Sequence, residues 1–190
     1  DPDRFKHEGP QVRFKLDPFY LCTTETTLEL FMIYYEETVS NERDTERSAN
    51  DVDANSGATP VYGDIKMGYD IQHPAIGMTW LNAVTFCKWL SEKTGKTYVL
   101  PTEAQWEYAC RSGSEMKFGV TDNPDEMGEY AWYDENSEQA TYPVAQKKPN
   151  AYGLYDMQGN VSEWVQDFYS PTAYAEASAE APLKNPTGPE

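Results

Sequence analysis

Apolar positions at helical spacing mark out a regular segment most clearly between residues 79 and 95. Thr79 stands where a helix N-cap is expected, and Gly95 stands where the chain should leave the helix. The apolar stripe between them consists of Trp80, Ala83, Val84, Cys87 and Leu90. We therefore predict a helix over this segment, packed into the core along that stripe.

Two further helices are indicated by threonines placed three residues before a glutamate or glutamine, which is the spacing of a capping box. Thr26 and Glu29 open the first, while Thr102 and Gln105 open the second, which is expected to end at Gly113. The inward positions are predicted to be Leu28, Phe31, Met32 and Tyr35 in the first helix and Trp106, Ala109 and Cys110 in the second. Because 14% of residues are aromatic, we expect aromatic side chains to dominate the core.

Two short segments are predicted to be strands. Residues 11–16 alternate apolar and polar positions, which places Val12, Phe14 and Leu16 on one face until Asp17-Pro18 ends the pattern. Residues 96–100 are predicted to form a second short strand. Residues 114–150 are turn-rich and aromatic without helical periodicity, so the fold class is expected to be α+β with little regular secondary structure.

The chain is expected to hold one domain over residues 1–170. Residues 40–75 are polar and lack periodicity, which indicates a long surface excursion. Residues 171–190 are rich in proline and alanine and poor in large apolar groups, which is typical of a linker or an extended tail.

The charge balance restricts the partners of the chain. Its 15 basic and 32 acidic residues give a formal charge of −17, so its field repels nucleic acid and anionic lipid. No apolar run reaches the roughly 20 residues that span a bilayer, and the first residues do not resemble a signal peptide. We expect a soluble chain from which any leader has been removed, and favour an exported or periplasmic location over others.

The cysteines and histidines exclude some kinds of site. Cys22, Cys87 and Cys110 are too few and too widely spaced for a disulfide framework, and each is expected to be a small buried side chain. His7 and His73 are the two histidines, so a three-histidine iron site cannot be built from this chain.

Four segments in order carry a resemblance to a known family. They are residues 17–27 (DPFYLCTTETT), 74–90 (PAIGMTWLNAVTFCKWL), 100–113 (LPTEAQWEYACRSG) and 149–164 (PNAYGLYDMQGNVSEW). Over about residues 11–169 the chain resembles the formylglycine-generating-enzyme, or sulfatase-modifying factor, family. The resemblance implies a compact α+β domain related to C-type lectin-like topology and stabilised by calcium.

The activity implied by the resemblance is the oxidation of a sulfatase cysteine to formylglycine by oxygen and copper. In the family two Cu(I)-binding cysteines follow an Arg-Gly-Gly-Ser strand, and this chain ends at Glu190 before such a strand. The fold is therefore expected to be incomplete at its C-terminus, with copper bound only where that segment is present. A protein or peptide partner is expected, and a companion fragment could complete the domain.

Departures from the family pattern lower the expectation of standard activity. Val99 stands where the family usually has arginine, Gln105 where it has glutamate, and Ser162 where it has tryptophan. Two hypotheses follow. The chain is either the N-terminal portion of an oxidase domain, inactive alone, or a non-catalytic lectin-like binding or assembly module of a larger complex.

The segment YDMQGNVSEW is the candidate metal site. Asp156 and Glu163 flank the Gly159-Asn160 turn, and carboxylates mixed with carbonyls suit calcium better than zinc or copper. The resemblance assigns calcium-binding positions to Asp156, Met157, Gly159, Val161 and Glu163, with side-chain ligands from Asp156 and Glu163. In the alternative interpretation this is an ordinary turn, and Glu163 simply points to solvent or caps an amide. We further expect the turn to lie beside the tryptophan-bearing helices, and Asn136 to be a structural polar anchor rather than part of a second calcium site.

Overall fold

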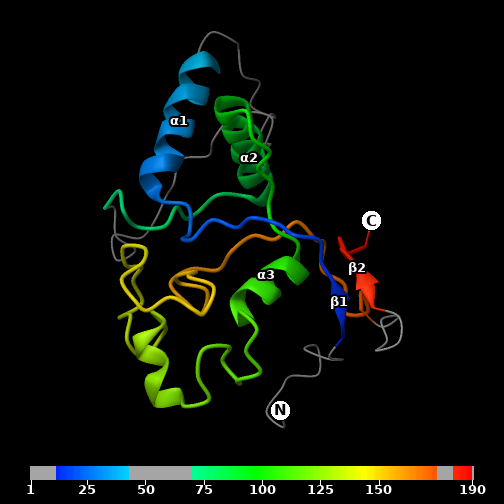
Figure 1. Ribbon diagram of the computed structural model, residues 1–190. Coiled ribbons are helices and arrows are strands. Elements are labelled where there is room, and N and C mark those ends of the chain that lie inside the picture. The colour runs from blue at the N-terminus through cyan, green and yellow to red at the C-terminus, as the bar shows by residue number, and fades with distance from the viewer. Residues whose placement is uncertain (1–11, 43–69, 175–181, 190) are drawn as a thin grey trace.

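A computed structural model describes residues 12–42, 70–174 and 182–189 of the chain (Figure 1). In chain order its elements are β1 (Phe14–Lys15), α1 (Leu28–Glu42), α2 (Trp80–Thr94), α3 (Glu103–Arg111), the 3-10 helix η3 (Pro124–Glu129) and β2 (Leu183–Lys184). The rest of the described chain is turns and loops, so the predicted α+β character with little regular structure is confirmed. Within these described residues no helix is long and apolar enough to cross a membrane.

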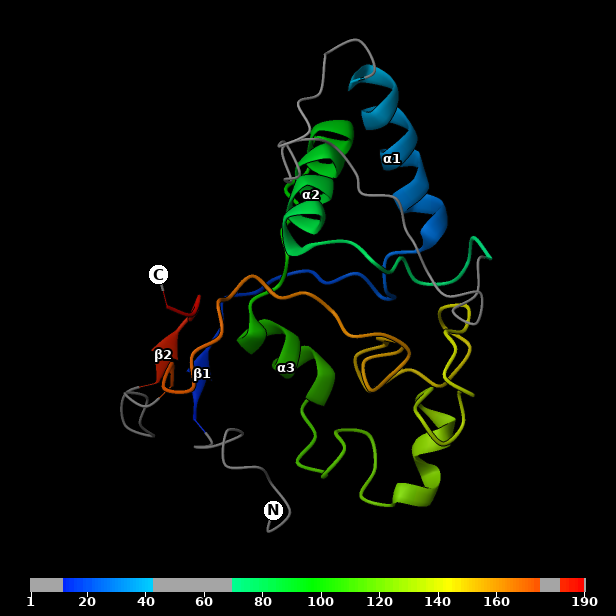
Figure 2. The ribbon, with the colours of Figure 1, turned by 180° about the vertical axis from the view of Figure 1, so that it is seen from behind.

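Helices α1 and α2 lie side by side, with α3 and the loops of residues 114–165 below them (Figures 1 and 2). An aromatic cluster fills the contact between α1 and α2. Tyr34 is fully buried and packs edge to face against Phe31 and Phe86, with ring centroids 5.5 and 5.6 Å away. Such aromatic pairs contribute about 0.5–1.5 kcal/mol beyond the burial of their surface. The predicted aromatic core is confirmed.

The start and the buried face of α1 differ from the prediction. Leu30 N donates to Thr27 Oγ1 at 3.4 Å, so Thr27 rather than Thr26 caps the helix. The Thr26 carbonyl instead accepts from Ala75 N at 2.8 Å and ties this segment to the chain before α2. Tyr35, predicted to be buried, is half-buried and Tyr34 takes the central place. Both tyrosines stand at helical spacing from Phe31, so the pattern could not separate them.

The predicted bounds of α2 are confirmed. The Thr79 side chain accepts from Asn82 N, the Asn82 side chain accepts from Thr79 N, and Gly95 ends the helix with φ of 70°. The buried residues are Asn82 and Phe86, however, and the predicted stripe is half-buried. Asn82 is buried because its side chain completes the cap.

Helix α3 begins as predicted and ends two residues early. Thr102 and Gln105 form the reciprocal cap, while Ser112, with φ of 47°, replaces Gly113 as the residue where the helix stops. Ala109 and Cys110 are buried as expected, and Trp106 packs half-buried against the cluster they form with Leu154 and Met157.

The predicted strand over residues 96–100 is wrong. This segment is irregular, and Tyr98 N donates to Ser91 Oγ at 2.8 Å. A side chain of α2 therefore satisfies the backbone donor that a neighbouring strand would have taken.

Strand β1 pairs in parallel with β2, with Phe14 opposite Leu183. Asp17 and Asn185 strengthen the junction, because Asp17 N donates to Asn185 Oδ1 and Asn185 Nδ2 donates to Asp17 Oδ2, each at 2.8 Å. Of the strand predicted over residues 11–16, the structure forms Phe14–Lys15, while Gln11 lies outside the described residues. Part of the predicted tail therefore packs against the body of the domain.

Two sequence predictions fall partly outside the described residues. The surface excursion at 40–75 overlaps the end of α1 at 40–42, and its residues 43–69 are not described. Tail residues 175–181 are also not described. The relationship to C-type lectin-like topology stays a prediction.

Candidate metal centre

Asp156 is a buried carboxylate at the start of the predicted metal-binding loop. It is 3% exposed and its backbone is left-handed, with φ of 59°. Oδ2 accepts from Ala145 N at 2.7 Å, while Oδ1 is buried and has no hydrogen-bond partner among the described residues. Burial raises the pKa of this carboxyl group. An unpartnered buried carboxylate oxygen is costly in a protein, and a bound cation would remove that cost.

Glu25 is a second buried carboxylate beside this loop, and sequence reasoning missed it. Its Oε2 accepts from Asn160 Nδ2 at 2.8 Å, and its Oε1 accepts from Val161 N at 3.2 Å. Burial, followed by the charge of Asp156 and more weakly that of Glu163, raises the pKa of Glu25 to about 8. Two carboxylates of the loop and one from a distant part of the chain therefore act on one another here. The sequence signal that could have found Glu25 is its place in the DPFYLCTTETT segment, one of the four segments that carry the family resemblance.

Glu163 lies at the other end of the loop. Its Oε2 accepts from Trp106 Nε1 of α3 at 3.2 Å. The residue is exposed, but its carboxyl group lies against protein, and this desolvation together with the charge of Asp156 raises its pKa. Glu163 is thus exposed, as the alternative interpretation expects, and it also accepts a hydrogen bond from α3.

Gly159 and Asn160 fix the turn between the two carboxylates. A Cβ atom on Gly159 would lie 2.1 Å from the Trp132 carbonyl oxygen, so only glycine fits there. Asn160 N donates to that same oxygen at 2.8 Å. The Asn160 amide also pairs with the backbone of Tyr142, accepting from its N–H at 2.9 Å and donating to its carbonyl at 3.0 Å. The turn is therefore held from two sides.

Tryptophan side chains fasten the end of the loop to the helices. Trp80 Nε1 of α2 donates to the Val165 carbonyl at 2.8 Å, and Trp164 Nε1 donates to the Met78 carbonyl at 3.2 Å. With the Trp106–Glu163 contact, these bonds confirm that the turn lies beside the tryptophan-bearing helices.

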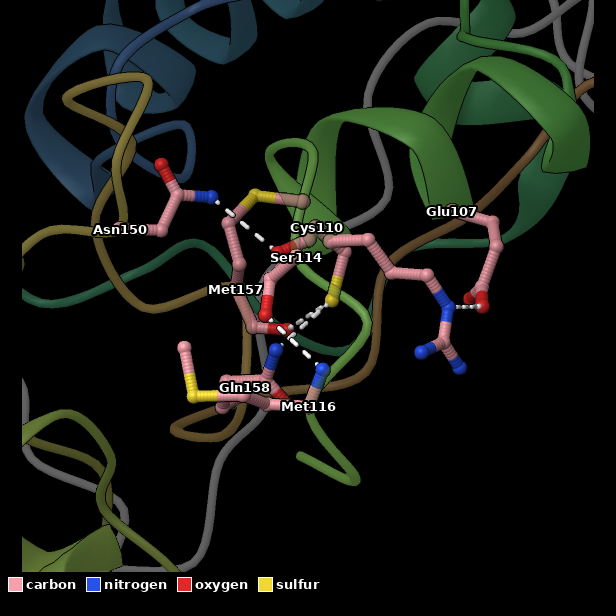
Figure 3. A network of polar contacts seen from close by, with 8 residues as sticks. Glu107, Cys110, Ser114, Met116, Asn150, Met157 and Gln158 are labelled. Atoms are coloured by element: carbon pink, nitrogen blue, oxygen red, sulfur yellow. Dashed lines mark hydrogen bonds and ion pairs between the residues drawn. The ribbon is translucent and has the colours of Figure 1, made fainter. Parts of the chain in front are cut away.

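Met157, a predicted main-chain ligand, is buried against α3 (Figure 3). Its carbonyl accepts from Cys110 Sγ at 3.4 Å, and the same sulfur accepts from Gln158 Nε2 at 2.9 Å. A carbonyl oxygen has two lone pairs, so one remains for a cation.

The cysteines differ in exposure. Cys110 is buried and Cys87 is half-buried, and burial raises their pKa values to about 12 and about 11. Cys22 is exposed, so its predicted burial is wrong. It stands in an irregular segment where no periodicity indicates which side chains face inward.

Two other polar residues have structural partners. Asn136 accepts from Tyr133 N at 2.7 Å and donates to the Ala131 carbonyl at 3.0 Å, as expected of a polar anchor. His73 Nδ1 lies 3.0 Å from Thr141 Oγ1. His7 lies outside the described residues.

The donor set of the loop consists of oxygen atoms, which fits calcium. Among the residues that the structure describes, no three histidine, cysteine or acidic side chains converge closely enough to hold a metal ion. A calcium ion here would therefore need main-chain oxygens as well as the carboxylates. The five predicted positions carry both kinds of oxygen in one continuous segment.

The sequence comparison with known families agrees with this arrangement. The family described as "Sulfatase-modifying factor enzyme 1-like domain" matches residues 2–186. The chain belongs to this family. Its loop of Asp156–Glu163 and the capped helices beside it are thus parts of a sulfatase-modifying-factor domain.

Relatives of this domain have several names. It is 33% identical over 129 residues to a formylglycine-generating enzyme of Streptomyces coelicolor, covering 62% of this chain and 38% of that protein. It is 36% identical over 126 residues to the serine/threonine-protein kinase pkn1 of Chlamydia pneumoniae, covering 66% of this chain and 18% of the kinase. The chain therefore spans less than half the length of these relatives.

Solved structures of similar fold are also longer than the sulfatase-modifying-factor domain described here. Treponema denticola variable protein 1 matches with a TM-score of 0.61 and 25% identity over 87% of this chain and 66% of that chain. PvdO from Pseudomonas aeruginosa matches with a TM-score of 0.61 and 27% identity over 88% of this chain and 62% of its own.

Proposed function

We propose that this sulfatase-modifying-factor domain binds calcium at the loop of residues 156–163. Asp156 and Glu163 supply side-chain oxygens, and Glu25 adds a third carboxylate nearby. Met157, Gly159 and Val161 are the main-chain ligands.

The observation that carries this proposal is the buried Oδ1 atom of Asp156, which has no hydrogen-bond partner among the described residues. The mutual repulsion of Asp156, Glu25 and Glu163 supports it, because a divalent cation would offset that repulsion. Calcium supplies no redox chemistry. Its part is to hold the loop against α2 and α3.

A calcium titration tests the proposal on the 190-residue chain after treatment with a chelator. At a calcium concentration 100 times the dissociation constant, binding to the folded state should add about 2.7 kcal/mol of stability. The Asp156→Asn variant should lose this increase, whereas Asp125→Asn, an exposed carboxylate in η3, should keep it. A melting temperature that calcium leaves unchanged in the parent chain would overturn the proposal.

The catalytic part of the proposal concerns copper. The resemblance assigns copper to two cysteines in a further segment, and the thiols of Cys87 and Cys110 have raised pKa values that suit buried packing rather than metal binding. We propose that this chain alone provides the scaffold and does not oxidise a cysteine. Copper chemistry would then require the companion segment.

Two observations support a companion segment. Trp164, Phe168 and Tyr169 are 50, 67 and 78% exposed, which is unusual for three large aromatic residues so close in sequence. The solved relatives are also longer, since this chain matches 62–66% of PvdO and of the Treponema protein. A segment packing over these residues would complete the fold.

An activity assay separates the scaffold from a complete enzyme. The chain is incubated with a Cys-x-Pro-x-Arg peptide, oxygen and copper, and the peptide mass is followed. We expect no aldehyde. Conversion to the aldehyde by this chain would overturn the scaffold proposal.

The second candidate function is a non-catalytic binding or assembly module with a protein or peptide partner. The 36% identity to a protein named as a kinase favours the module. In that protein the shared region occurs together with a different named activity. The two functions are distinguished by a chain extended to include a companion segment. Aldehyde formation by that chain supports the oxidase, and calcium binding without it supports the module.

A further inference from the structure

One face of α3 contacts both ends of the candidate calcium loop. Trp106 and Cys110 stand four residues apart, so they lie about one turn apart on the same side of the helix. Trp106 Nε1 donates to the Glu163 carboxylate, and Cys110 Sγ donates to the Met157 carbonyl directly after Asp156. One rigid element therefore contacts the segments that carry both side-chain ligands.

Cys110 is held to the loop by two hydrogen bonds of its buried side chain (Figure 3). The side chain is 6% exposed, and its sulfur both donates to the Met157 carbonyl and accepts from the Gln158 amide.

A third contact holds the same helix end to the loop. Asn150 Nδ2 donates to the carbonyls of Ala109 and Cys110 at 2.8 and 3.3 Å, while Asn150 Oδ1 accepts from Leu154 N at 3.1 Å. The last turn of α3 and the approach to Asp156 therefore form one hydrogen-bonded unit.

We infer that α3 is a positioning helix for the calcium loop, with Trp106 setting the Glu163 end and Cys110 setting the Asp156 end. This inference rests on the calcium site proposed above. Neither residue is a ligand. Each acts by holding a ligand-bearing segment at the distance that one cation requires, as partners behind metal ligands do in other sites.

The test measures calcium affinity by calorimetry on the full 190-residue chain. Cys110→Ala removes both sulfur contacts, and Trp106→Phe removes the N–H while keeping an aromatic ring. Each should weaken calcium binding by about 10–100-fold, which is the usual cost of losing a partner behind a metal ligand. Cys110→Ser keeps a hydrogen-bond donor and should recover most of the affinity lost in Cys110→Ala.

Matched variants separate positioning from general destabilisation. Trp89→Phe removes an indole bond of the same kind, but one donated to the Glu37 carboxylate of α1 and not to the loop. Cys87→Ala removes a half-buried thiol from α2. Both should lower the melting temperature of the calcium-free chain and leave calcium affinity unchanged.

The outcomes distinguish this inference from the proposed function. If the parent chain binds no calcium, the proposed site itself fails. If the parent binds and both α3 variants bind equally well, the positioning role is overturned. Should Cys110→Ala not fold, Cys110→Ser and Trp106→Phe decide the question by comparison with Trp89→Phe.

Discussion

Asn160 Nδ2 lies 2.8 Å from Glu25 Oε2 and joins two residues that stand 135 positions apart in the chain. The same amide pairs with the backbone of Tyr142, so one side chain connects the segment before α1, the loop at 142 and the candidate calcium loop. One polar side chain therefore joins segments that apolar packing usually joins in a domain with more regular structure.

Asn160→Asp should strongly destabilise the chain. It replaces the amide donor with a carboxylate oxygen that faces Glu25 Oε2 and the Tyr142 carbonyl, so two hydrogen bonds become repulsive contacts. We expect a loss of about 3 kcal/mol or more in urea unfolding without calcium at pH 9, where Glu25 is ionised because its pKa is about 8. Asn123→Asp is the comparison, because Asn123 Nδ2 also donates to a carboxylate oxygen, Glu126 Oε1 at 3.2 Å, but at an exposed cap where solvent screens the repulsion. Equal stability of the two variants would contradict the prediction.

Gly159→Ala should also destabilise the fold, for a steric reason. The new Cβ would lie 2.1 Å from the Trp132 carbonyl oxygen, and a backbone atom cannot move aside as the end of a side chain can. We expect a cost of about 3 kcal/mol in urea unfolding. Gly128→Ala provides the comparison, because its Cβ would meet Asn136 Nδ2 at an ordinary 3.5 Å. A neutral Gly159→Ala would show that Trp132 does not approach so closely.

The three thiols should react at very different rates. Cys22 is exposed, whereas burial raises the pKa values of Cys87 and Cys110 to about 11 and about 12. At pH 8 we expect one fast equivalent with a disulfide reagent and two slow ones that become fast in denaturant. Mass mapping after brief alkylation should place the label on Cys22. Rapid labelling of Cys110 in the folded chain would contradict its packing against Met157.

Packing of the tail should weaken in acid. The hydrogen bond from Asn185, followed by Lys184, lowers the pKa of Asp17 below its ordinary 3.8. A lowered folded-state pKa means that the carboxylate favours the paired state above pH 3.8 and that this contribution disappears as the pH falls through the folded value. Hydrogen exchange at Asp17 N and Asn185 N should therefore accelerate in acid beyond the intrinsic rate. Asp17→Asn should remove the pH dependence.

Local signals in the sequence predicted local structure well. The N-cap at Thr79, the capping box at Thr102 and the glycine at the end of α2 were predicted correctly, because each depends on residues within one turn. Helical spacing alone could not separate Tyr34 from Tyr35. The segment at 96–100 looked like a strand because nothing in it shows that Ser91 supplies its hydrogen bond.

The sequence predicted the part of the candidate site that lies in one continuous segment. It did not predict the contacts of that segment with distant parts of the chain. Residues 156–163 form one continuous motif, and its turn and carboxylates were found from the sequence. Glu25 comes from a distant segment, and its burial depends on Asn160 and Val161, which no sequence pattern connects to it. The contacts of Trp106 and Cys110 with the loop likewise depend on how α3 packs.

The parallel pairing of β1 with β2 also has a consequence for folding. The bond from Asp17 N to Asn185 Oδ1 beside this pairing joins residues 168 positions apart, so the closure of a very long loop must precede it. Contacts of such high sequence separation form late and slow the overall rate. During synthesis β2 emerges from the ribosome after α1, α2 and α3, so these helices can pack first. The pairing of β1 with β2 would then form after the helices have packed.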